Sequence, residues 1–230
     1  MRAVILAAGC GSRMGDVTED VPKAFLEVGG RTLYDRQREV VTEHVDGITI
    51  VLGYKYENVV DDLSSADPVV FERWSDYENA ESLRRALERV DDEVLVLNGD
   101  VVVEPGLLDR LVDRYRLFDG AVNVVGCFPG VQDEHTAIQC DGANNVVDYG
   151  MIHGHRHAGV GIISRRHRDA ALDVLADNSD DWYPHVYPET PTKRVTVSPN
   201  QHVEINRPSD LATARERFPL ARPGERDTAR

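Results

Sequence analysis

Residues 6–23 read LAAGCGSRMGDVTEDVPK, and this stretch decides the fold. Its first residue closes an apolar run, AVIL, with the length and composition of a strand that is buried on both faces. Gly9 and Gly11 allow the backbone to approach a ligand closely, so that its N–H groups can point at phosphate oxygens. Arg13 and Lys23 add two positive charges to the same loop. The sequence therefore predicts a buried strand followed by a loop that holds a nucleoside triphosphate.

Two other phosphate-binding loops do not fit this stretch. A dinucleotide-binding turn needs G-x-G-x-x-G, but position 14 is methionine and the next glycine, Gly15, comes one residue too late. A Walker-type loop needs Gly-Lys-Ser/Thr, which is absent. Pro22 keeps Val21 extended and stiffens the approach to Lys23.

Short apolar runs alternate with amphipathic stretches along the chain, and this pattern predicts a parallel sheet covered by helices. Strands are predicted at 2–7, 47–52, 67–71, 93–98, 121–127, 145–149, 157–163 and 193–198. Helices are predicted at 32–45, 79–90, 105–115, 165–177 and 208–218. We expect one domain over residues 1–218. Residues 219–230 contain two prolines, a glycine and little to bury, so we expect a mobile tail.

The charge of the chain is strongly negative. It has 26 basic and 40 acidic residues, a net charge of −14, and its only lysines are Lys23, Lys55 and Lys193. An acidic, lysine-poor surface is typical of a salt-adapted cytoplasm, where high ionic strength screens the carboxylates from one another. The alternative is an ordinary acidic protein from a GC-rich genome. In either case broad nucleic-acid binding is not expected, because there is no basic face to displace phosphate counterions.

Cysteine content and hydropathy indicate the cellular setting. The three cysteines, Cys10, Cys127 and Cys140, are odd in number and lack a Cys-x-x-Cys spacing, so we expect reduced thiols without a disulfide framework or thiolate metal site. No stretch approaches eighteen apolar residues, and the N-terminus leads into the glycine-rich loop without a charged-then-apolar leader. We therefore expect a cytoplasmic protein without membrane association.

The whole stretch resembles the signature of the nucleotidyltransferase family that makes sugar nucleotides and their relatives, L-A-[AG]-G-x-G-x-R followed about ten residues later by P-K. The matching residues are Leu6, Ala7, Ala8, Gly9, Gly11, Arg13, Pro22 and Lys23. The resemblance implies a three-layer α/β/α Rossmann-like fold with a mostly parallel central sheet. It also implies that Arg13 and Lys23 act in catalysis. The residues that it implies for nucleotide binding are Leu6, Ala7, Ala8, Gly9, Gly11, Ser12, Arg13 and Lys23.

A second element of the family is an apolar strand that ends in Gly-Asp, here VLVLNGD at residues 94–100. A carboxylate at the carboxyl end of a parallel strand lies where open α/β sheets place their ligands. Mg²⁺ prefers oxygen ligands and takes few protein carboxylates when it is bound with phosphates. The resemblance implies that Asp100 is the catalytic, metal-binding aspartate that also meets the nucleotide. The alternative is an aspartate that only caps a turn.

The third element is HVEIN at residues 202–206, followed by Asp210, Leu211 and Ala214. It resembles the C-terminal element of the family, a strand ending in Glu-Ile-Asp before a proline and a helix. The expected aspartate is replaced by Asn206. An amide oxygen can also coordinate Mg²⁺, and acetylglucosamine-1-phosphate uridylyltransferases have Asn at the equivalent place, so the resemblance implies that Asn206 is the second metal ligand. The alternative is a helix cap.

The segment YENAESL, residues 77–83, resembles the choline-phosphate cytidylyltransferase branch, in which an Asn-rich segment opens the helix before the Gly-Asp strand. Asn79 and Ser82 are therefore expected to hydrogen-bond the nucleotide base. Alternatively, Asn79 only caps the helix.

A run of alternating histidines, His153, His155 and His157, has two interpretations. On a strand the three imidazoles would share one face and bind a transition metal. Otherwise the run is a polar loop at the mouth of the pocket, with His157 or Arg156 meeting the acceptor phosphate. Trp182 and Tyr183 are expected to wall the acceptor pocket.

These observations predict an Mg²⁺-dependent enzyme that transfers a nucleoside monophosphate from an NTP to a sugar 1-phosphate or phosphorylated small alcohol. Its partners would be small molecules, with no nucleic acid and no membrane, and a homo-oligomer is compatible with the sequence. Asn206 leaves open a catalytically silent nucleotide sensor on the same fold. A molybdopterin guanylyltransferase is a third interpretation, but its lysine follows soon after Arg-Met-Gly, where this chain reads Asp-Val-Thr-Glu from position 16.

Overall fold

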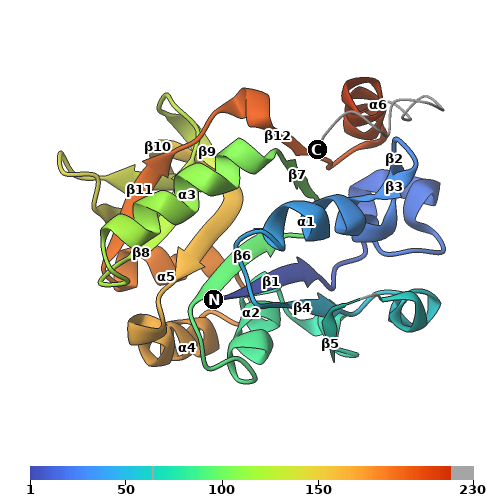
Figure 1. The fold of residues 1–230 in the computed structure, drawn as a ribbon, viewed down its shortest axis with the longest axis horizontal. Coiled ribbons are helices and arrows are strands. Elements are labelled where there is room, and N and C mark those ends of the chain that lie inside the picture. Colours follow the sequence, from blue (N-terminus) through green and yellow to red (C-terminus); the bar gives the residue numbers. More distant parts are fainter. Residues whose placement is uncertain (64, 219–230) are drawn as a thin grey trace.

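A mostly parallel β-sheet forms the centre of the computed structural model, which describes residues 1–63 and 65–218 (Figure 1). In spatial order its strands are β11 (Thr192–Thr196), β8 (Asn123–Cys127), β10 (Val146–Ile163), β6 (Val94–Asn98), β1 (Arg2–Ala7), β4 (Gly47–Leu52) and β5 (Asp67–Val70). Strands β6, β1, β4 and β5 are parallel, whereas β10 is antiparallel to both β6 and β8. The apolar run of β1 is buried on both faces at the centre of this sheet, as predicted.

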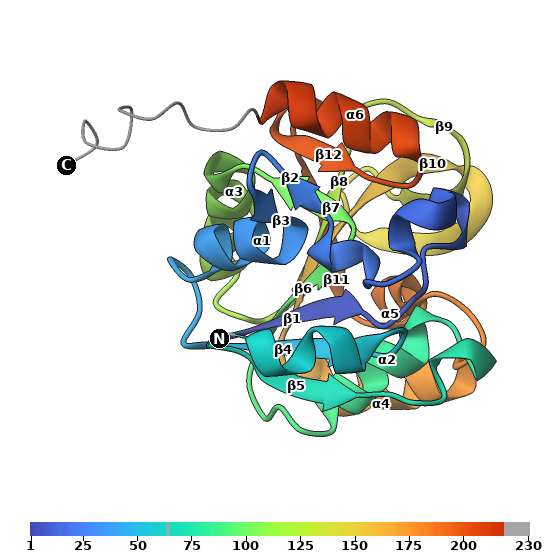
Figure 2. The ribbon, with the colours of Figure 1, turned by 90° about the vertical axis from the view of Figure 1, so that its right-hand side faces the viewer.

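Helices cover both faces of the sheet. On one face α1 (Leu33–Val41) and α3 (Pro105–Leu117) pack against β1, β4 and β10. On the other face α2 (Asn79–Leu87), α4 (Arg168–Asp177) and α5 (Val186–Glu189) contribute to a second apolar cluster. Figure 2 shows the two helical layers on opposite sides of the strands. The predicted three-layer α/β/α fold is therefore confirmed.

A third apolar cluster holds the C-terminal helix beside the glycine-rich loop. It joins α6 (Pro208–Arg217) to β2 (Glu27–Val28) and β7 (Val101–Val103), and it includes Met14 of the loop. β2 pairs with β3 (Arg31–Thr32), and β7 pairs with β12 (His202–Glu204). The pairing of β7 with β12 brings the segment after β12 next to the end of β6, so two distant parts of the sequence meet at one edge of the sheet (Figure 2).

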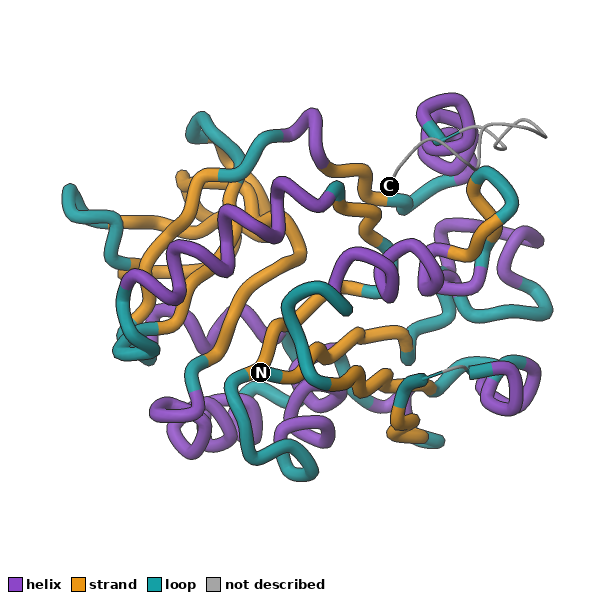
Figure 3. Tube along the Cα trace, in the orientation of Figure 1, coloured by secondary structure: helices purple, strands orange, loops and turns teal. Residues whose placement is uncertain are grey.

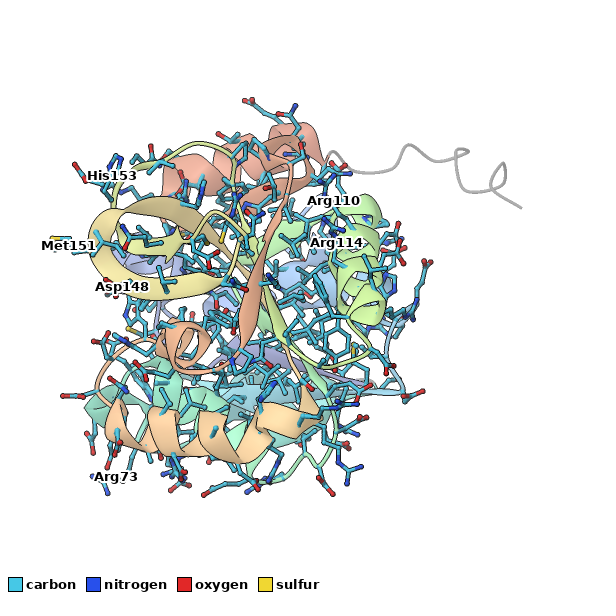
Figure 4. The ribbon with its side chains drawn as sticks, turned by 90° about the vertical axis from the view of Figure 1, so that its left-hand side faces the viewer. Arg73, Arg110, Arg114, Asp148, Met151 and His153 are labelled. Carbon is cyan, nitrogen blue, oxygen red and sulfur yellow. The ribbon has the colours of Figure 1, made fainter. Side chains whose placement is uncertain are left out.

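β10 belongs to two sheets. Its last residues pair with β6 and β8, whereas residues from Val146 to Arg156 pair with β9 (Gln132–Cys140) in a curved arm. The register shifts between His157 and Gly161, and Gly159 between them has a φ of 68°, in the left-handed region that favours glycine. In Figure 4 the labelled Asp148, Met151 and His153 lie on the outer edge of this arm.

Three predictions about elements differ from the structure (Figure 3). The helix predicted at 32–45 begins behind a capping box, in which Thr32 Oγ1 accepts from the Asp35 N–H at 3.0 Å, but it ends at Val41. The strands predicted at 145–149 and 157–163 are one continuous strand, so the polar-loop interpretation of the histidine run was wrong. β9 was not predicted. The predicted tail, 219–230, lies outside the described residues.

Within the described ranges, we find no helix whose length and apolarity would allow it to cross a lipid bilayer.

Candidate active site

A cleft of about 440 Å³ opens at the carboxyl ends of β1 and β6. This is where an open α/β sheet places its ligands. The cleft is lined by every residue that the sequence analysis assigned to the nucleotide or the metal: Leu6, Ala7, Ala8, Gly9, Gly11, Ser12, Arg13, Lys23, Asn79, Ser82, Asp100 and Asn206. The structure therefore brings the three sequence elements together around one cavity, while the role of each residue stays a prediction.

The glycine-rich loop presents free backbone donors to this cleft. Its start is fixed by its neighbours, because the Gly99 N–H donates to Leu6 O and the Tyr54 N–H donates to Ala8 O, both at 2.8 Å. In contrast, no described residue accepts a hydrogen bond from the N–H groups of the loop residues 9–11. Gly11 has a φ of 64°, which turns the chain into the 3₁₀ turn Ser12–Thr18. Such a row of unpaired N–H groups is suited to phosphate oxygens.

Four side chains from distant parts of the chain meet at one end of the cleft. Lys23 Nζ lies 2.6 Å from Asp100 Oδ2 and 3.3 Å from Asn206 Oδ1. Arg13 Nη2 donates to the same Asn206 Oδ1 at 2.6 Å. The side chains of Lys23 and Asp100 are only 13% and 20% exposed. Two cations and two oxygen-bearing side chains thus form a compact, partly desolvated cluster.

The oxygens of this cluster fit a magnesium ion. Asp100 Oδ1 is buried and has no hydrogen-bond partner among the described residues, which leaves it available as a ligand. Asn206 Oδ1 lies 3.3 Å from the same Lys23 Nζ. One carboxylate and one amide oxygen, completed by phosphate and water, suit Mg²⁺. The residues present at this site therefore fit the ion.

The capping alternative for Asn206 was wrong. The N-cap of α6 is Arg207, and Asp210 Oδ2 accepts from the backbone N–H groups of both Asn206 and Arg207 at 2.9 and 2.8 Å. Asp210 thus satisfies the start of the helix, and the Asn206 side chain turns toward Arg13 and Lys23 instead.

The capping alternative for Asn79 was also wrong. Glu78 occupies the N-cap of α2, and Asn79 is the first helical residue. Asn79 Oδ1 accepts from the Tyr183 N–H at 2.8 Å, and the Glu78 N–H donates to Ser179 O at 3.1 Å. The start of α2 therefore fastens the segment that leads to Trp182. No described residue accepts from the amide nitrogen of Asn79, so this donor remains for a ligand in the cleft.

Of the three residues expected to contact the acceptor, only Trp182 lies on the cleft. It is 37% exposed, whereas Tyr183 is fully buried and His157 is 6% exposed. Tyr183 Oη and His157 Nε2 lie 3.5 Å apart inside the second apolar cluster. Burial lowers the pKa of His157 to about 4, so its ring is neutral. We therefore leave Tyr183 and His157 out of the proposed acceptor contacts.

The three histidines do not converge on a metal. His155 Nδ1 lies 2.6 Å from Gly130 O, and His153 Nδ1 lies 3.4 Å from Asp133 Oδ1 in the exposed arm. Across the part of the chain that the structure describes, there is no group of three or more His, Cys, Asp or Glu side chains that could hold a metal. The transition-metal interpretation is therefore not supported.

A second cavity, of about 470 Å³, lies on the other side of Asn206. Arg156 and Glu204 form an ion pair at its wall, and the Arg156 guanidinium lies 5.5 Å from the centre of the Phe128 ring. Burial alone would raise the pKa of the Glu204 carboxyl group. Hydrogen bonding from Asn206 and the charge of Arg156 outweigh it and lower that pKa. Asn206 lines both cavities, whereas Lys23 lines only the first of these two.

The sequence analysis missed several residues that line the first cleft: Trp74, Tyr77, Glu78 and Asn98. Asn98 directly precedes the Gly-Asp pair that the family signature contains, so its position was a usable signal. The other three follow β5, and the rule that ligands bind at carboxyl ends of parallel strands also points to them.

Comparisons with known proteins show which proteins this chain resembles. A family model described as MobA-like NTP transferase domain matches residues 3–181. The bifunctional protein GlmU of Methanocaldococcus jannaschii is 33% identical over 118 residues, which cover 51% of this chain and 29% of that protein. The CMP-5'-(3-aminopropyl)phosphonate synthase of Streptomyces rubellomurinus is 35% identical over 119 residues, which cover 48% of this chain and 19% of that protein. The chain thus spans less than a third of the length of either relative.

A solved structure extends the comparison over nearly the whole chain. The inositol-1-phosphate CTP transferase from T. maritima superposes with a TM-score of 0.73, covering 96% of this chain and 98% of that one. Its sequence identity is 19%, so this likeness concerns the fold alone.

Proposed function

This chain belongs to the family of MobA-like NTP transferase domains, and on that premise we propose that it is a nucleotidyltransferase for a phosphorylated small molecule. The reaction joins the nucleoside monophosphate of an NTP to a sugar 1-phosphate or a phosphorylated small alcohol and releases pyrophosphate. The observation that carries the proposal is the cluster of Lys23, Arg13, Asp100 and Asn206 beside the free N–H groups of the glycine-rich loop.

The reaction is an in-line displacement at the α-phosphorus. An oxygen of the acceptor phosphate forms a bond to this phosphorus, and the bond from the α-phosphorus to its bridging oxygen breaks. The electron pair of that bond leaves with pyrophosphate. No general base is needed, because the attacking oxygen is already ionised. Catalysis then depends on alignment of the two phosphates and on neutralisation of their charge.

Each residue of the cluster has a place in this scheme. Residues 9–12 supply backbone donors to the triphosphate, and Arg13 holds the departing pyrophosphate. Lys23 lies between the α-phosphate and the acceptor phosphate. It already contacts oxygens of both Asp100 and Asn206, so its ammonium group is held in place before a substrate arrives. Asp100 and Asn206 would hold Mg²⁺, which supplies charge neutralisation for the phosphates when it is bound.

The base and the acceptor would occupy opposite sides of this cluster. Asn79 and Ser82 line the first cleft on the base side. The second cavity, with Arg156 and Glu204, is the proposed place for the organic part of the acceptor, since it reaches Asn206 from the other side. The names of two similar proteins, an inositol-1-phosphate CTP transferase and a CMP-5'-(3-aminopropyl)phosphonate synthase, indicate acceptors of this class. We place the reaction in the cytoplasm.

The test is pyrophosphate release by the purified chain with four NTPs, Mg²⁺ and a panel of hexose 1-phosphates, inositol 1-phosphate, phosphocholine and molybdopterin. We expect one combination to release pyrophosphate in equal amount to a nucleotide–acceptor conjugate identified by mass spectrometry. NTP binding without turnover on the whole panel would instead support the silent sensor. Release only with GTP and molybdopterin would support the third interpretation.

A further inference from the structure

Gln37 is a polar residue in the centre of the apolar layer between α1 and the sheet. Its side chain is completely buried. Its Nε2 donates two hydrogen bonds, each of 2.7 Å, to the backbone oxygens of Asn98 and Val101. Its Oε1 is buried and has no partner among the described residues. A buried amide with one unpaired end is costly, so its presence here calls for a specific reason.

The two carbonyl groups that Gln37 contacts enclose the turn that carries Asp100. The same turn is held from two other directions: the Gly99 N–H donates to Leu6 O at 2.8 Å, and Asp100 O accepts from the Ile205 N–H at 2.9 Å. The turn is therefore fixed by β1, by α1 and by the segment that carries Asn206. Of the backbone groups of this turn, the oxygens of Asn98 and Val101 are held by a side chain, that of Gln37.

The orientation of the Asp100 carboxylate depends on this attachment. One of its oxygens lies 2.6 Å from Lys23 Nζ, and the other is buried without a partner. At such distances a displacement of about 1 Å changes the alignment of reacting groups enough to cost about 10²-fold in rate. An amide NH₂ can donate to two carbonyl oxygens at once, which an apolar side chain of the same length cannot do.

We infer that Gln37 is a positioning residue that holds the Asn98–Val101 turn so that Asp100 can bind the metal beside Lys23. The inference rests on the proposed function, because it takes Asp100 as the metal ligand. The inference also connects α1 to the site. The hydrogen bonds of Gln37 reach Asn98 and Val101, which are 61 and 64 residues further along the chain and lie on either side of Asp100.

The test replaces Gln37 by methionine, which keeps the length of the side chain and removes both donors. The matched control is Val41→Ala, one turn later on α1 and also fully buried, but in the apolar cluster rather than at the turn. Binding of Mn²⁺ in the presence of a non-hydrolysable NTP analogue is measured by electron paramagnetic resonance, which needs no turnover. Thermal melts and steady-state rates are measured on the same samples.

For Gln37→Met we expect a Mn²⁺ dissociation constant raised by about tenfold or more, as is typical when a residue that orients a metal ligand is lost. We expect kcat to fall, with little change in the KM of the acceptor. For Val41→Ala we expect a lower melting temperature with wild-type Mn²⁺ affinity and kcat. Mn²⁺ affinity within twofold of wild type in Gln37→Met, or equal changes in both variants, would overturn the inference.

If Gln37→Met does not fold, Gln37→Glu decides, because it keeps the shape and removes the NH₂ group. A folded Gln37→Glu protein with weakened Mn²⁺ binding supports the inference, and failure of both variants to fold assigns Gln37 a purely structural role and overturns it. If the proposed function is wrong, the wild-type protein binds Mn²⁺ and nucleotide without turnover. The Mn²⁺ affinities of wild type and Gln37→Met can then still be compared, so the two failures are distinguishable.

Discussion

Lys23 lies between the carboxylate of Asp100 and the amide oxygen of Asn206, in a chain that has only two other lysines. Lysine is a compact, strongly hydrated charge, and its side chain here is 13% exposed. Asp100 and Asn206 together accept hydrogen bonds from it. A point charge held firmly between a carboxylate and an amide oxygen is suited to a reaction in which two phosphates approach each other.

Replacing Lys23 by alanine should lower kcat by about 10²- to 10³-fold, because it removes charge that is needed most when the α-phosphorus becomes five-coordinate. The measurement is the steady-state rate of pyrophosphate release, with circular dichroism to show that the fold is retained. Lys193→Ala is the control, since it deletes the same charge from a lysine that contacts Ala143 O on the surface. Near-normal turnover of a folded Lys23→Ala protein would remove Lys23 from the mechanism.

Asn206 gives a second test at a single residue. Asn206→Ala should raise the Mg²⁺ concentration for half-maximal activity by about tenfold, because it removes one oxygen ligand. Asn206→Asp should keep or lower that concentration, because a carboxylate binds Mg²⁺ more strongly than an amide. Mg²⁺ titrations of both variants measure the effect, with Asn200→Ala as a control outside the cleft. An unchanged half-saturation in Asn206→Ala would defeat the assignment as a ligand.

The role of a residue could be predicted from the sequence where it belongs to a continuous motif, and not where it depends on contacts with residues distant in the chain. The residues from Leu6 to Lys23 form one continuous signature, and each of its matching residues except Pro22 lines the cleft. Gln37 carries no such signal, because its partners lie 61 and 64 residues away and only the packing of α1 on the sheet brings them together. The burial of Tyr183 and His157 was equally hidden, since a polar ring in a short sequence context indicates a surface as readily as a core.

At the scale of elements, burial on both faces made the central strands predictable. β1, β4 and β6 lie between two helical layers, so their sequences are mostly apolar. The arm formed by β9 and the first half of β10 does not lie between two such layers. β9 and the first half of β10 pair with each other and leave Val147 and Met151 about half or more exposed, so they show mixed polar and apolar residues. A short stretch of sequence with this mixed pattern does not show that it forms a strand, or that β9 pairs with β10.

Two strands carry buried histidines that should make stability depend on pH. Burial lowers the pKa of His157 on β10 and of His202 on β12 to about 4, against about 6.5 in an unfolded chain. Glu204 lies near both rings and opposes the shift without cancelling it. The unfolded state therefore binds protons more readily between these values. The contribution of the two neutral rings to the free energy of unfolding is therefore full above about pH 6.5, and it is lost as the pH falls toward 4.

Replacing both histidines by glutamine should remove this part of the acid sensitivity. Each ring accounts for at most about 3 kcal/mol of the change in unfolding free energy between pH 6.5 and pH 4. Urea unfolding at several pH values, compared between wild type and the double variant, measures it. His153→Gln, on the exposed arm, is the control and should follow wild type. Parallel pH curves for wild type and the double variant would show that the buried rings do not titrate as described.

The net charge of −14 is a property of the whole molecule, and it predicts the response to salt. At 0.01 M ionic strength the screening length is about 30 Å, so carboxylates repel one another across much of the surface, whereas at 1 M it is about 3 Å. Lys23 is only 13% exposed, so salt should weaken its contact with a triphosphate less than it relieves the repulsion between surface carboxylates.

Melting temperature and initial rate should therefore rise together from dilute buffer toward molar KCl. Thermal melts and initial rates across a KCl series check this. The NTP concentration is held above its KM, so that weaker binding of NTP at high salt does not hide a rise in rate. A melting temperature that stays flat or falls with salt would mean that the acidic surface reflects genome composition rather than adaptation to brine.

The division of β10 into two halves has a practical consequence for redesign. Upstream of the register shift the strand belongs to the arm, and downstream of it the strand belongs to the central sheet. At the junction, a Cβ atom on Gly159 would lie 3.0 Å from Val101 Cγ1 and 3.1 Å from Asn98 Nδ2. The glycine between the two halves of β10 therefore packs directly against the turn that carries Asp100. Chimeras that exchange arms between relatives should therefore be spliced before His157, with the glycine junction inherited from the recipient scaffold.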